Sequence, residues 1–482
     1  MRVGAIAHRL AHPSAEPWLL LASGLLTALG LALADQSAAV MLSAAQTVLL
    51  VSLFLRSVGG RRGWRSAEFV VATAWMLLFT VPCWLYALDW TLLDQGTPAR
   101  ATLIVNIALY GYLLGLLLRP RTGLPVEGPV AVAPMQPRAR VLIGWWMLGI
   151  ASLAALLLRH GNPLDYLLHL DRSAALNLGA FYLVALALVM RFAALAWAAG
   201  SWSRGEPMPR LAIALALGGT VLIGLTGGRL FIAVALADFL LLYVLLRRPI
   251  ALRRAAPFVI AIGLLIIFGL GTLKRYQGYN AAHPKARVSL PHYAIKQAPS
   301  EFASAYANNY VDSVRLLAIA DRLVPRSADW EGDRALLEMA VKPLPRAIRP
   351  KIERQDVLRT AFNPTEDYAF AMPLIGTSFL AGGALVVLLV SIGTGALVAA
   401  LDRRLASDDL SARDAVVLVV AVVAFPNVMR GGLPAGVVLL LVDVVGMWVV
   451  ARTGLRAGSE EAVAQPSAAD DAAMLRGTGS PN

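Results

Sequence analysis

The stretch "LFIAVALADFLLLYVLL", residues 230–246, is apolar at every position except Asp238 and is flanked by an arginine at each end. A helix rises about 1.5 Å per residue, so a helix of this length covers most of the roughly 30 Å hydrocarbon core of a bilayer. Similar stretches recur along the chain, in which 58% of the 482 residues are hydrophobic and only 15% are charged. A water-soluble domain could not bury so much apolar surface in one core. The composition therefore predicts a protein that crosses a membrane many times.

Twelve apolar windows are long enough to span the bilayer. Each is expected to form a helix, because backbone that faces lipid must satisfy its own polar groups. The predicted fold class is an all-α polytopic membrane protein with about 12 transmembrane helices and a large, partly helical extracytoplasmic loop. The windows cover residues 17–34, 37–55, 67–88, 101–118, 141–158, 174–199, 211–226, 230–246, 256–273, 371–398, 414–429 and 434–451.

The distribution of lysine and arginine predicts the orientation of these spans, because cations are translocated poorly and stay in the cytoplasm. With the N-terminus inside, the short cytoplasmic segments hold 21 of these residues and the short outer segments hold five. Both termini are then cytoplasmic, and residues 274–370 form a long outer segment. Much of the net charge of +13 reports topology, so nucleic acid is not expected as a partner.

The hydropathy pattern divides the chain into four parts. They are an N-terminal transmembrane bundle (1–273), an extracytoplasmic loop that we call the cap (274–370), three C-terminal transmembrane helices (371–451) and a disordered cytoplasmic tail (452–482). Disorder is predicted for the tail because its residues are mostly small and polar, which is typical of disordered segments. The chain has a single cysteine, Cys83, so it cannot form an intramolecular disulfide.

The cap is too long and too patterned for a simple connection. Within residues 301–324 the apolar side chains recur close to a helical period and predict one apolar face, formed by Phe302, Tyr306, Tyr310, Val314, Leu317 and Leu323. A second helix is predicted to begin with Asp333 as its N-cap and to stop at Pro343. After it, "KPLPRAIRPKIER", residues 342–354, combines prolines that stiffen the chain with projecting cations.

Two arginines stand in short outer turns against the topological bias, each beside a pair of glycines. Arg430 belongs to "FPNVMRGGLP", residues 425–434, and Arg229 belongs to "TGGR", residues 226–229. Cations at this depth can extend to lipid phosphates. Alternatively, both bind one anionic ligand, which the glycines allow to approach closely. Their recurrence beneath an arginine-rich cap favours the shared anion.

These features together resemble a known family. The segment "LTGGRLFIAVALADFLLLYVL" (225–245), the long outer loop, "KPLPRAIRP" late in that loop and the arginine–glycine turn near the end are similar to those of Wzy-type O-antigen polymerases, which join oligosaccharide repeat units. O-antigen ligases are related to them. The likeness covers roughly residues 210–450 and rests on the order and spacing of the features.

The resemblance implies that a glycan on undecaprenyl pyrophosphate is transferred, outside the bacterial cytoplasmic membrane, to the non-reducing end of another lipid-linked repeat unit. The implied partners are the lipid-linked glycans, membrane lipid, a chain-length regulator and a flippase. Two alternatives stay open. An O-antigen ligase shares the architecture and differs in acceptor, whereas a flippase needs a central cavity and no large cap.

Breaking a sugar–pyrophosphate bond requires stabilisation of the departing anion by a metal ion or by fixed cations. Arginine suits the second option, because it stays charged and grips phosphate oxygens in a bidentate fork. The candidates for pyrophosphate binding are Arg229, Arg430, Arg346, Arg349 and Lys351. No metal or other cofactor is therefore expected.

The acceptor hydroxyl needs at most one general base. The candidates on the outer face are Glu366, Asp367 and His292, with Glu301, His160, His169 and His283 as further titratable groups. Related sequences often have an acidic residue beside the glycine that begins the span after the loop. Here Thr377 follows Gly376, which puts a base role at that point in doubt.

The motif "DWEGD", residues 329–333, has an acidic side chain at every second position (Asp329, Glu331 and Asp333) and could therefore bind a hard metal ion. A charged turn that ends in a helix cap is the preferred interpretation. Metal-dependent enzymes acting on polyprenyl-phosphate sugars place acid pairs in a sizeable first outer loop, whereas that connection is only "DQ" here.

Three charges fall well inside apolar spans: Arg191, Asp238 and Asp443. An unpaired charge there costs several kcal/mol. The sequence therefore predicts that Arg191 pairs with at least one aspartate and ties the sixth, eighth and twelfth spans together. The alternative is that the sixth span ends early, with the following residues lying in the membrane interface.

Overall fold

The computed structural model describes residues 15–33, 35–59, 63–88, 98–118, 132–159, 181–224, 229–247, 312–324, 372–407, 409–432 and 436–457, with isolated positions between 250 and 350. Within these ranges the protein is almost entirely helical, and eight helices are long and apolar enough to cross a membrane. Three shorter apolar helices accompany them, at Pro17–Ala32, Arg210–Leu222 and Ile232–Leu246. The protein is a polytopic α-helical membrane protein.

Eleven of the twelve apolar windows coincide with described helices, and the twelfth, 256–273, lies almost wholly outside the described residues. The first group is α2 (Ala15–Ala32), α3 (Asp35–Gly59), α4 (Ala67–Trp75), the π-helix η2 (Met76–Thr80), α5 (Val81–Ala87) and α6 (Pro98–Leu117). The second group is α7 (Ala139–Arg159), α10 (Phe181–Ala187), α11 (Val189–Ser203), α12 (Arg210–Gly224), α13 (Arg229–Leu246) and α22 (Val437–Gly454). Two more helices complete the bundle: α20 (Leu374–Leu405), which packs against α6 and α4 of the first group, and α21 (Ala412–Gly431), which lies between the groups.

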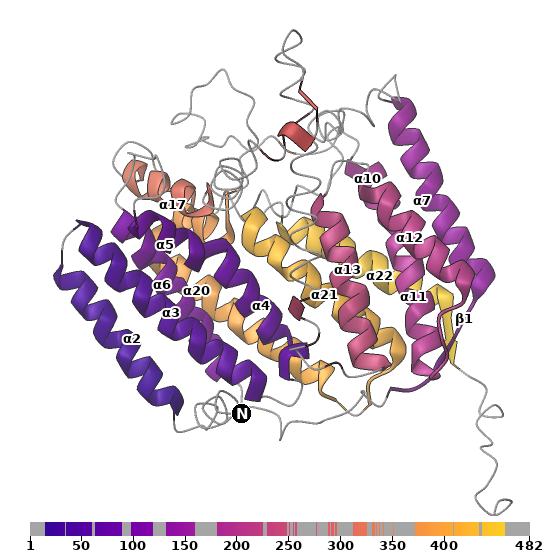
Figure 1. The fold of residues 1–482 in the computed structure, drawn as a ribbon, viewed down its shortest axis with the longest axis horizontal. Helices are drawn as coiled ribbons and strands as arrows, with labels where there is room; N and C mark the ends of the chain where they lie inside the picture. The colour runs from indigo at the N-terminus through magenta and orange to yellow at the C-terminus, as the bar shows by residue number, and fades with distance from the viewer. Residues whose placement is uncertain are drawn as a thin grey trace, which may run out of the picture.

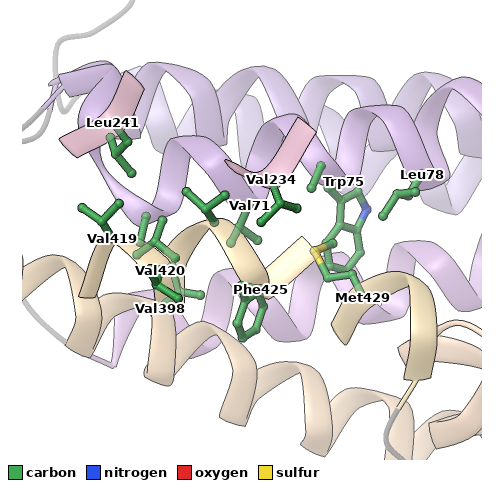
Figure 2. Close-up of a cluster of buried hydrophobic side chains, with 14 of the residues drawn as sticks. Val71, Trp75, Leu78, Val234, Leu241, Val398, Val419, Val420, Phe425 and Met429 are labelled. Carbon is green, nitrogen blue, oxygen red and sulfur yellow. The ribbon is translucent and has the colours of Figure 1, made fainter. Parts of the chain in front are cut away.

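Figure 1 shows the two groups side by side, with α21 between them, α20 behind the first group and α17 (Asp312–Leu323) over one end. We call that end the cap side. The helix α21 packs against α22, α11, α13, α20 and α4, and most of its side chains are buried. Figure 2 shows the apolar contact among three of these helices, where Val71 and Trp75 of α4 lie near Val234 of α13 and Met429 of α21. The end of α21 is therefore held from several sides.

Close backbone packing joins α6 to α20. A Cβ added at Gly115 would collide with the carbonyl oxygen of Ile392, and one added at Gly395 would collide with that of Tyr112. From Val387 onward, the buried residues of α20 recur at helical spacing (Val387, Ser391, Gly395 and Val398). Helices in lipid associate through small residues that let backbones approach, and this interface is built in that way.

The C-terminal end of α20 is held in place by polar contacts. The Asp402 carboxylate accepts hydrogen bonds from the backbone N–H groups of Ala67 and Glu68, at the start of α4. Ser66 accepts a further N–H of that first turn. The Arg56 guanidinium of α3 pairs with Glu68, with 2.9 Å between the charged atoms. These contacts satisfy the free donors of a helix start and join α3, α4 and α20.

The helix α20 is broken on the cap side of its centre. Gly382 and Gly383 have non-helical dihedral angles, and the φ of Gly383 is +71°. The window 371–398 predicts one uninterrupted span, so the break is a difference from the sequence expectation. Its physical reason is the glycine pair, because residues with a Cβ rarely adopt this conformation. Before the break every residue from Leu374 to Leu380 is buried, whereas large side chains after it, such as Leu385, are exposed.

The cap contacts this break. The Trp330 indole lies against Gly383, 3.1 Å from the position that a Cβ would take, and stacks edge-on against Phe379. The Glu331 backbone N–H donates a hydrogen bond to the Leu380 carbonyl oxygen over 2.8 Å. The interruption of the helix thus leaves a carbonyl that the cap satisfies.

Replacing Gly383 by alanine should destabilise the protein by about 1–3 kcal/mol, because the new Cβ forces a left-handed conformation and presses on Trp330. The matched control is Gly393→Ala, also in α20, where a Cβ meets nothing within 4 Å. Thermal unfolding in detergent should show a lower midpoint for Gly383→Ala alone. Equal midpoints for the two variants would mean that the break tolerates a side chain.

A short ribbon lies on the side opposite the cap, where the sequence predicts a loop and a disordered tail. Strand β1 (Met135–Pro137) pairs antiparallel with β2 (Leu455–Ala457), with Gln136 opposite Arg456. The Arg456 guanidinium bonds to the Gln136 side chain, and Arg413 donates to the Leu455 carbonyl. The expectation of disorder from residue 452 is therefore wrong for 452–457, because α22 continues to Gly454 and the next three residues are paired.

Candidate functional site

The helices that carry Arg229 and Arg430 run antiparallel against each other. In Figure 2, Val234 of α13 lies toward the same end of the view as Met429 of α21, and Leu241 lies toward the same end as Val419, while the two helices are in contact. The start of α13 and the end of α21 are therefore on the same side of the bundle, which is the cap side. Arg229 is the first residue of α13, and its side chain lies outside the described residues.

Arg430 lies in the last turn of α21, so the helix extends further than the window ending at 429. Its side chain is half-buried, and it makes no hydrogen bond or ion pair with any described residue. A cation in the last helical turn interacts favourably with the helix dipole, but this interaction leaves all five N–H donors of the guanidinium available. Arg430 is thus held in place by its helix with its donors unused by the described part of the chain.

Arg100, another arginine near the cap side, differs from Arg430 because it forms an ion pair. Arg100, at the start of α6, pairs with Asp321 of α17 through two contacts, Nε to Oδ2 at 2.8 Å and Nη2 to Oδ1 at 2.9 Å. This bidentate pair attaches the cap to the first group of helices. Arg100 and Arg430 are two of the five cations in the predicted short outer segments, and the structure distinguishes them, because Arg100 has an acidic partner among the described residues and Arg430 has none.

The turn after Arg430 fits closely against the start of α20. Gly432 has a φ of +70°, and a Cβ there would collide with the Met372 carbonyl oxygen and lie 2.7 Å from Thr377 Cγ2. The glycine pair after Arg430 therefore serves a close approach between two backbones as well as a turn. The Thr377 hydroxyl donates to the Leu374 carbonyl over 3.0 Å, inside its own helix.

Asn427 is a candidate that sequence reasoning missed. It lies three residues before Arg430 on α21, which places the two side chains on adjacent positions of one face. Asn427 is buried, and its amide forms no hydrogen bond with the described residues. A polar amide directly after Pro426 in an apolar span is the sequence signal that could have identified it. Together Asn427 and Arg430 offer amide and guanidinium donors at the cap-side end of α21.

Only some of the other predicted site residues lie within the described part of the chain. His292 is described and exposed. Glu366, Asp367, Arg346, Arg349 and Lys351 lie outside the described residues, as do Asp329, Asp333 and the segment 301–311. The predicted cap helix is present from Asp312 as α17, with Val314 and Leu317 buried and Leu323 half-buried. The structure thus places the start of α13 and the end of α21 on the same side of the bundle, with Gly432 against Thr377. Of the three candidate bases, only His292 lies within the described residues.

The three intramembrane charges form a group between α11, α13 and α22, which we call the triad. Arg191 Nη2 lies 2.9 Å from Asp443 Oδ1, and Arg191 Nε lies 3.4 Å from Asp238 Oδ2. All three side chains are almost fully buried. The pairing that the sequence predicts is present with both aspartates. Arg191 also lies over the Phe192 ring, which contacts Gly446 of α22.

Among the described residues, the groups at the cap-side ends of α13 and α21 are hydrogen-bond donors, which suit an anion. These groups are a half-buried guanidinium (Arg430), a buried amide (Asn427) and the backbone N–H groups at the start of α13, all of which can donate hydrogen bonds. Within the described ranges, no group of three or more histidine, cysteine or acidic side chains is arranged to hold a metal ion. No protein-family model, curated protein or solved structure matches this chain.

Proposed function

We propose that this chain is a membrane glycosyltransferase that polymerises undecaprenyl-pyrophosphate-linked oligosaccharide repeat units at the outer face of the bacterial cytoplasmic membrane. The observation that supports the proposal most directly is Arg430, half-buried at the end of α21 without a partner among the described residues. An arginine held this way fits a phosphate-bearing ligand at the headgroup level. The resemblance in order and spacing across residues 210–450 supplies the reaction class.

In the proposed reaction, the acceptor hydroxyl oxygen attacks the anomeric carbon of the donor glycan. The bond from that carbon to the pyrophosphate oxygen breaks, and its electron pair leaves with undecaprenyl pyrophosphate. Arg430 and Arg229 hold the departing anion, and Arg346, Arg349 and Lys351 of the cap close over the same charge. The hydroxyl proton passes to a general base, for which Glu366, Asp367 and His292 are the candidates.

Incubation of the purified protein in lipid nanodiscs with lipid-linked repeat units isolated from the source bacterium tests this function. A polymerase should produce glycans of two or more repeat units and release undecaprenyl pyrophosphate from this substrate alone. Inertness until a lipid A core acceptor is added would identify a ligase. Movement of the substrate across a vesicle membrane without bond formation would identify a flippase.

Treatment with a chelator tests whether fixed cations or a bound metal ion stabilises the charge on the departing pyrophosphate. Elongation should continue at an unchanged rate in excess EDTA, because arginines supply the positive charge in the proposed reaction. Loss of activity with EDTA, restored by Mg²⁺ or Mn²⁺, would contradict metal-independent catalysis.

The proposal includes twelve transmembrane helices, cytoplasmic termini and an outer cap, and cysteine labelling tests this orientation. On a Cys83→Ala background, Ile295→Cys in the cap, which is 78% exposed, should react with an impermeant thiol reagent in spheroplasts. Glu206→Cys, exposed between α11 and α12, should react only after permeabilisation. The reverse pattern would remove the basis for chemistry at the outer face.

A further inference from the structure

The triad carries unbalanced charge if all three of its side chains are ionised. One guanidinium, Arg191, faces two carboxylates, Asp238 and Asp443, which leaves one net negative charge in the bundle. The exposed fraction of the side chain is 1% for Arg191, 0% for Asp238 and 6% for Asp443. A buried charge without a counter-charge is strongly unfavourable, and a protein normally removes it by pairing or by binding a proton.

Nothing else in the described part of the chain supplies the missing positive charge. No other described residue forms an ion pair with these three side chains, and the aromatic neighbour Phe192 contributes no charge. The described residues contain no cluster of acidic side chains suited to a metal ion. A metal ion beside the carboxylates would also be repelled by the Arg191 guanidinium.

The two aspartates are not equivalent. The contact to Asp443 is 2.9 Å long, within the range of a charge-assisted hydrogen bond, whereas the contact to Asp238 is 3.4 Å. Hydrogen-bond geometry does not separate the two aspartates, because both Asp238 oxygens and Asp443 Oδ1 lack a hydrogen bond to any described residue. Distance and burial do separate them, since Asp238 has the longer contact and is the least exposed of the three. The ionised carboxylate belongs with the short contact, and the neutral carboxylic acid belongs with the long one.

We infer that the triad is a proton-binding site in which Asp238 is a neutral carboxylic acid and Arg191 and Asp443 form the ion pair. The triad is then electrically neutral. Asp238 lies nine residues into α13, about 13 Å from the cap-side end of that helix, so the proton is held near the middle of the membrane. This inference does not depend on the proposed glycosyltransferase reaction.

Infrared difference spectroscopy of the purified protein in nanodiscs tests the inference directly. The parent should show a protonated-carboxyl C=O band that shifts in D₂O and is absent from Asp238→Asn. The band should also be absent from Asp443→Asn, because the remaining Asp238 must then ionise to balance Arg191. The control is Asp409→Asn, an aspartate at the membrane surface with 75% exposure, which should leave the band unchanged.

Thermal stability identifies which aspartate holds the proton. Asp238→Asn resembles the neutral acid and keeps the 2.9 Å pair, so its melting temperature should stay within about 3 °C of the parent. Asp443→Asn keeps only the longer contact and should melt at least about 10 °C lower. The double variant leaves Arg191 unpaired and should lose the folded protein.

Three outcomes would overturn the inference. A band that persists in Asp238→Asn would place the proton on another carboxyl group. Equal destabilisation by the two single substitutions would indicate two ionised carboxylates. A parent without the band, stabilised by sodium chloride but not by choline chloride, would show that a metal cation balances the charge.

Discussion

Replacing Arg430 by alanine should lower the rate of glycan elongation about a hundredfold at unchanged expression and folding. A bidentate contact to a departing pyrophosphate contributes a few kcal/mol in the transition state, which corresponds to about two orders of magnitude in rate. Lysine keeps the charge but loses the planar fork, so Arg430→Lys should be nearly as impaired as Arg430→Ala. Arg229→Ala and Arg229→Lys should impair elongation to a similar extent as the corresponding Arg430 variants. Rates would be measured with lipid-linked repeat units in nanodiscs.

The matched control for Arg430 is Arg159. Both are arginines in the last turn of a membrane-spanning helix at the predicted outer face, but Arg159 is exposed whereas Arg430 is half-buried. Arg159→Ala should therefore leave the elongation rate unchanged. If alanine at both Arg229 and Arg430 leaves chain elongation intact, these arginines bind lipid headgroups and the catalytic interpretation is wrong.

Replacing Gly115 by leucine should abolish correct folding, or lower the free energy of unfolding by more than the roughly 1–3 kcal/mol usual for overpacking. The reason is that the neighbours of Gly115 are backbone atoms of Ile392 and Ala396, which cannot move aside as a side chain can. Even alanine should separate α6 from α20. Yield, monodispersity in detergent and melting temperature would report the effect.

Gly144 provides the comparison for Gly115, because it lies in the membrane-spanning helix α7 with nothing within 4 Å of an added Cβ. Gly144→Leu should express and melt like the parent. A Gly115→Leu protein as stable as the Gly144→Leu protein would show that α6 and α20 pack less closely than described.

Hydropathy predicts the helices well because lipid imposes one solution on every apolar span. The pairing of Arg191 with the aspartates was predictable for a related reason, since charges inside apolar windows have few alternatives to each other. The cap helix followed from its apolar period, although its described part begins only at Asp312.

Features that depend on contacts between distant residues were not predictable. The break at Gly382–Gly383 is stabilised by Trp330, some fifty residues earlier in the chain, and a glycine pair alone does not report a kink. The ribbon joins Gln136 to Arg456 through backbone pairing that no apolar pattern encodes. Among the arginines, sequence bias could not distinguish Arg100, which pairs with Asp321, from Arg430.

The ribbon also has a consequence for the order in which the protein is made. The ribosome synthesises β1 after the first group of helices, but β2 follows α22 and emerges after every described helix. The backbone of Met135–Pro137 therefore remains unpaired with β2 during membrane insertion of the helices, until Leu455–Ala457 has been translated. The ribbon can therefore form only after the last described helix has been synthesised, and a chain that stops before Leu455 cannot form it.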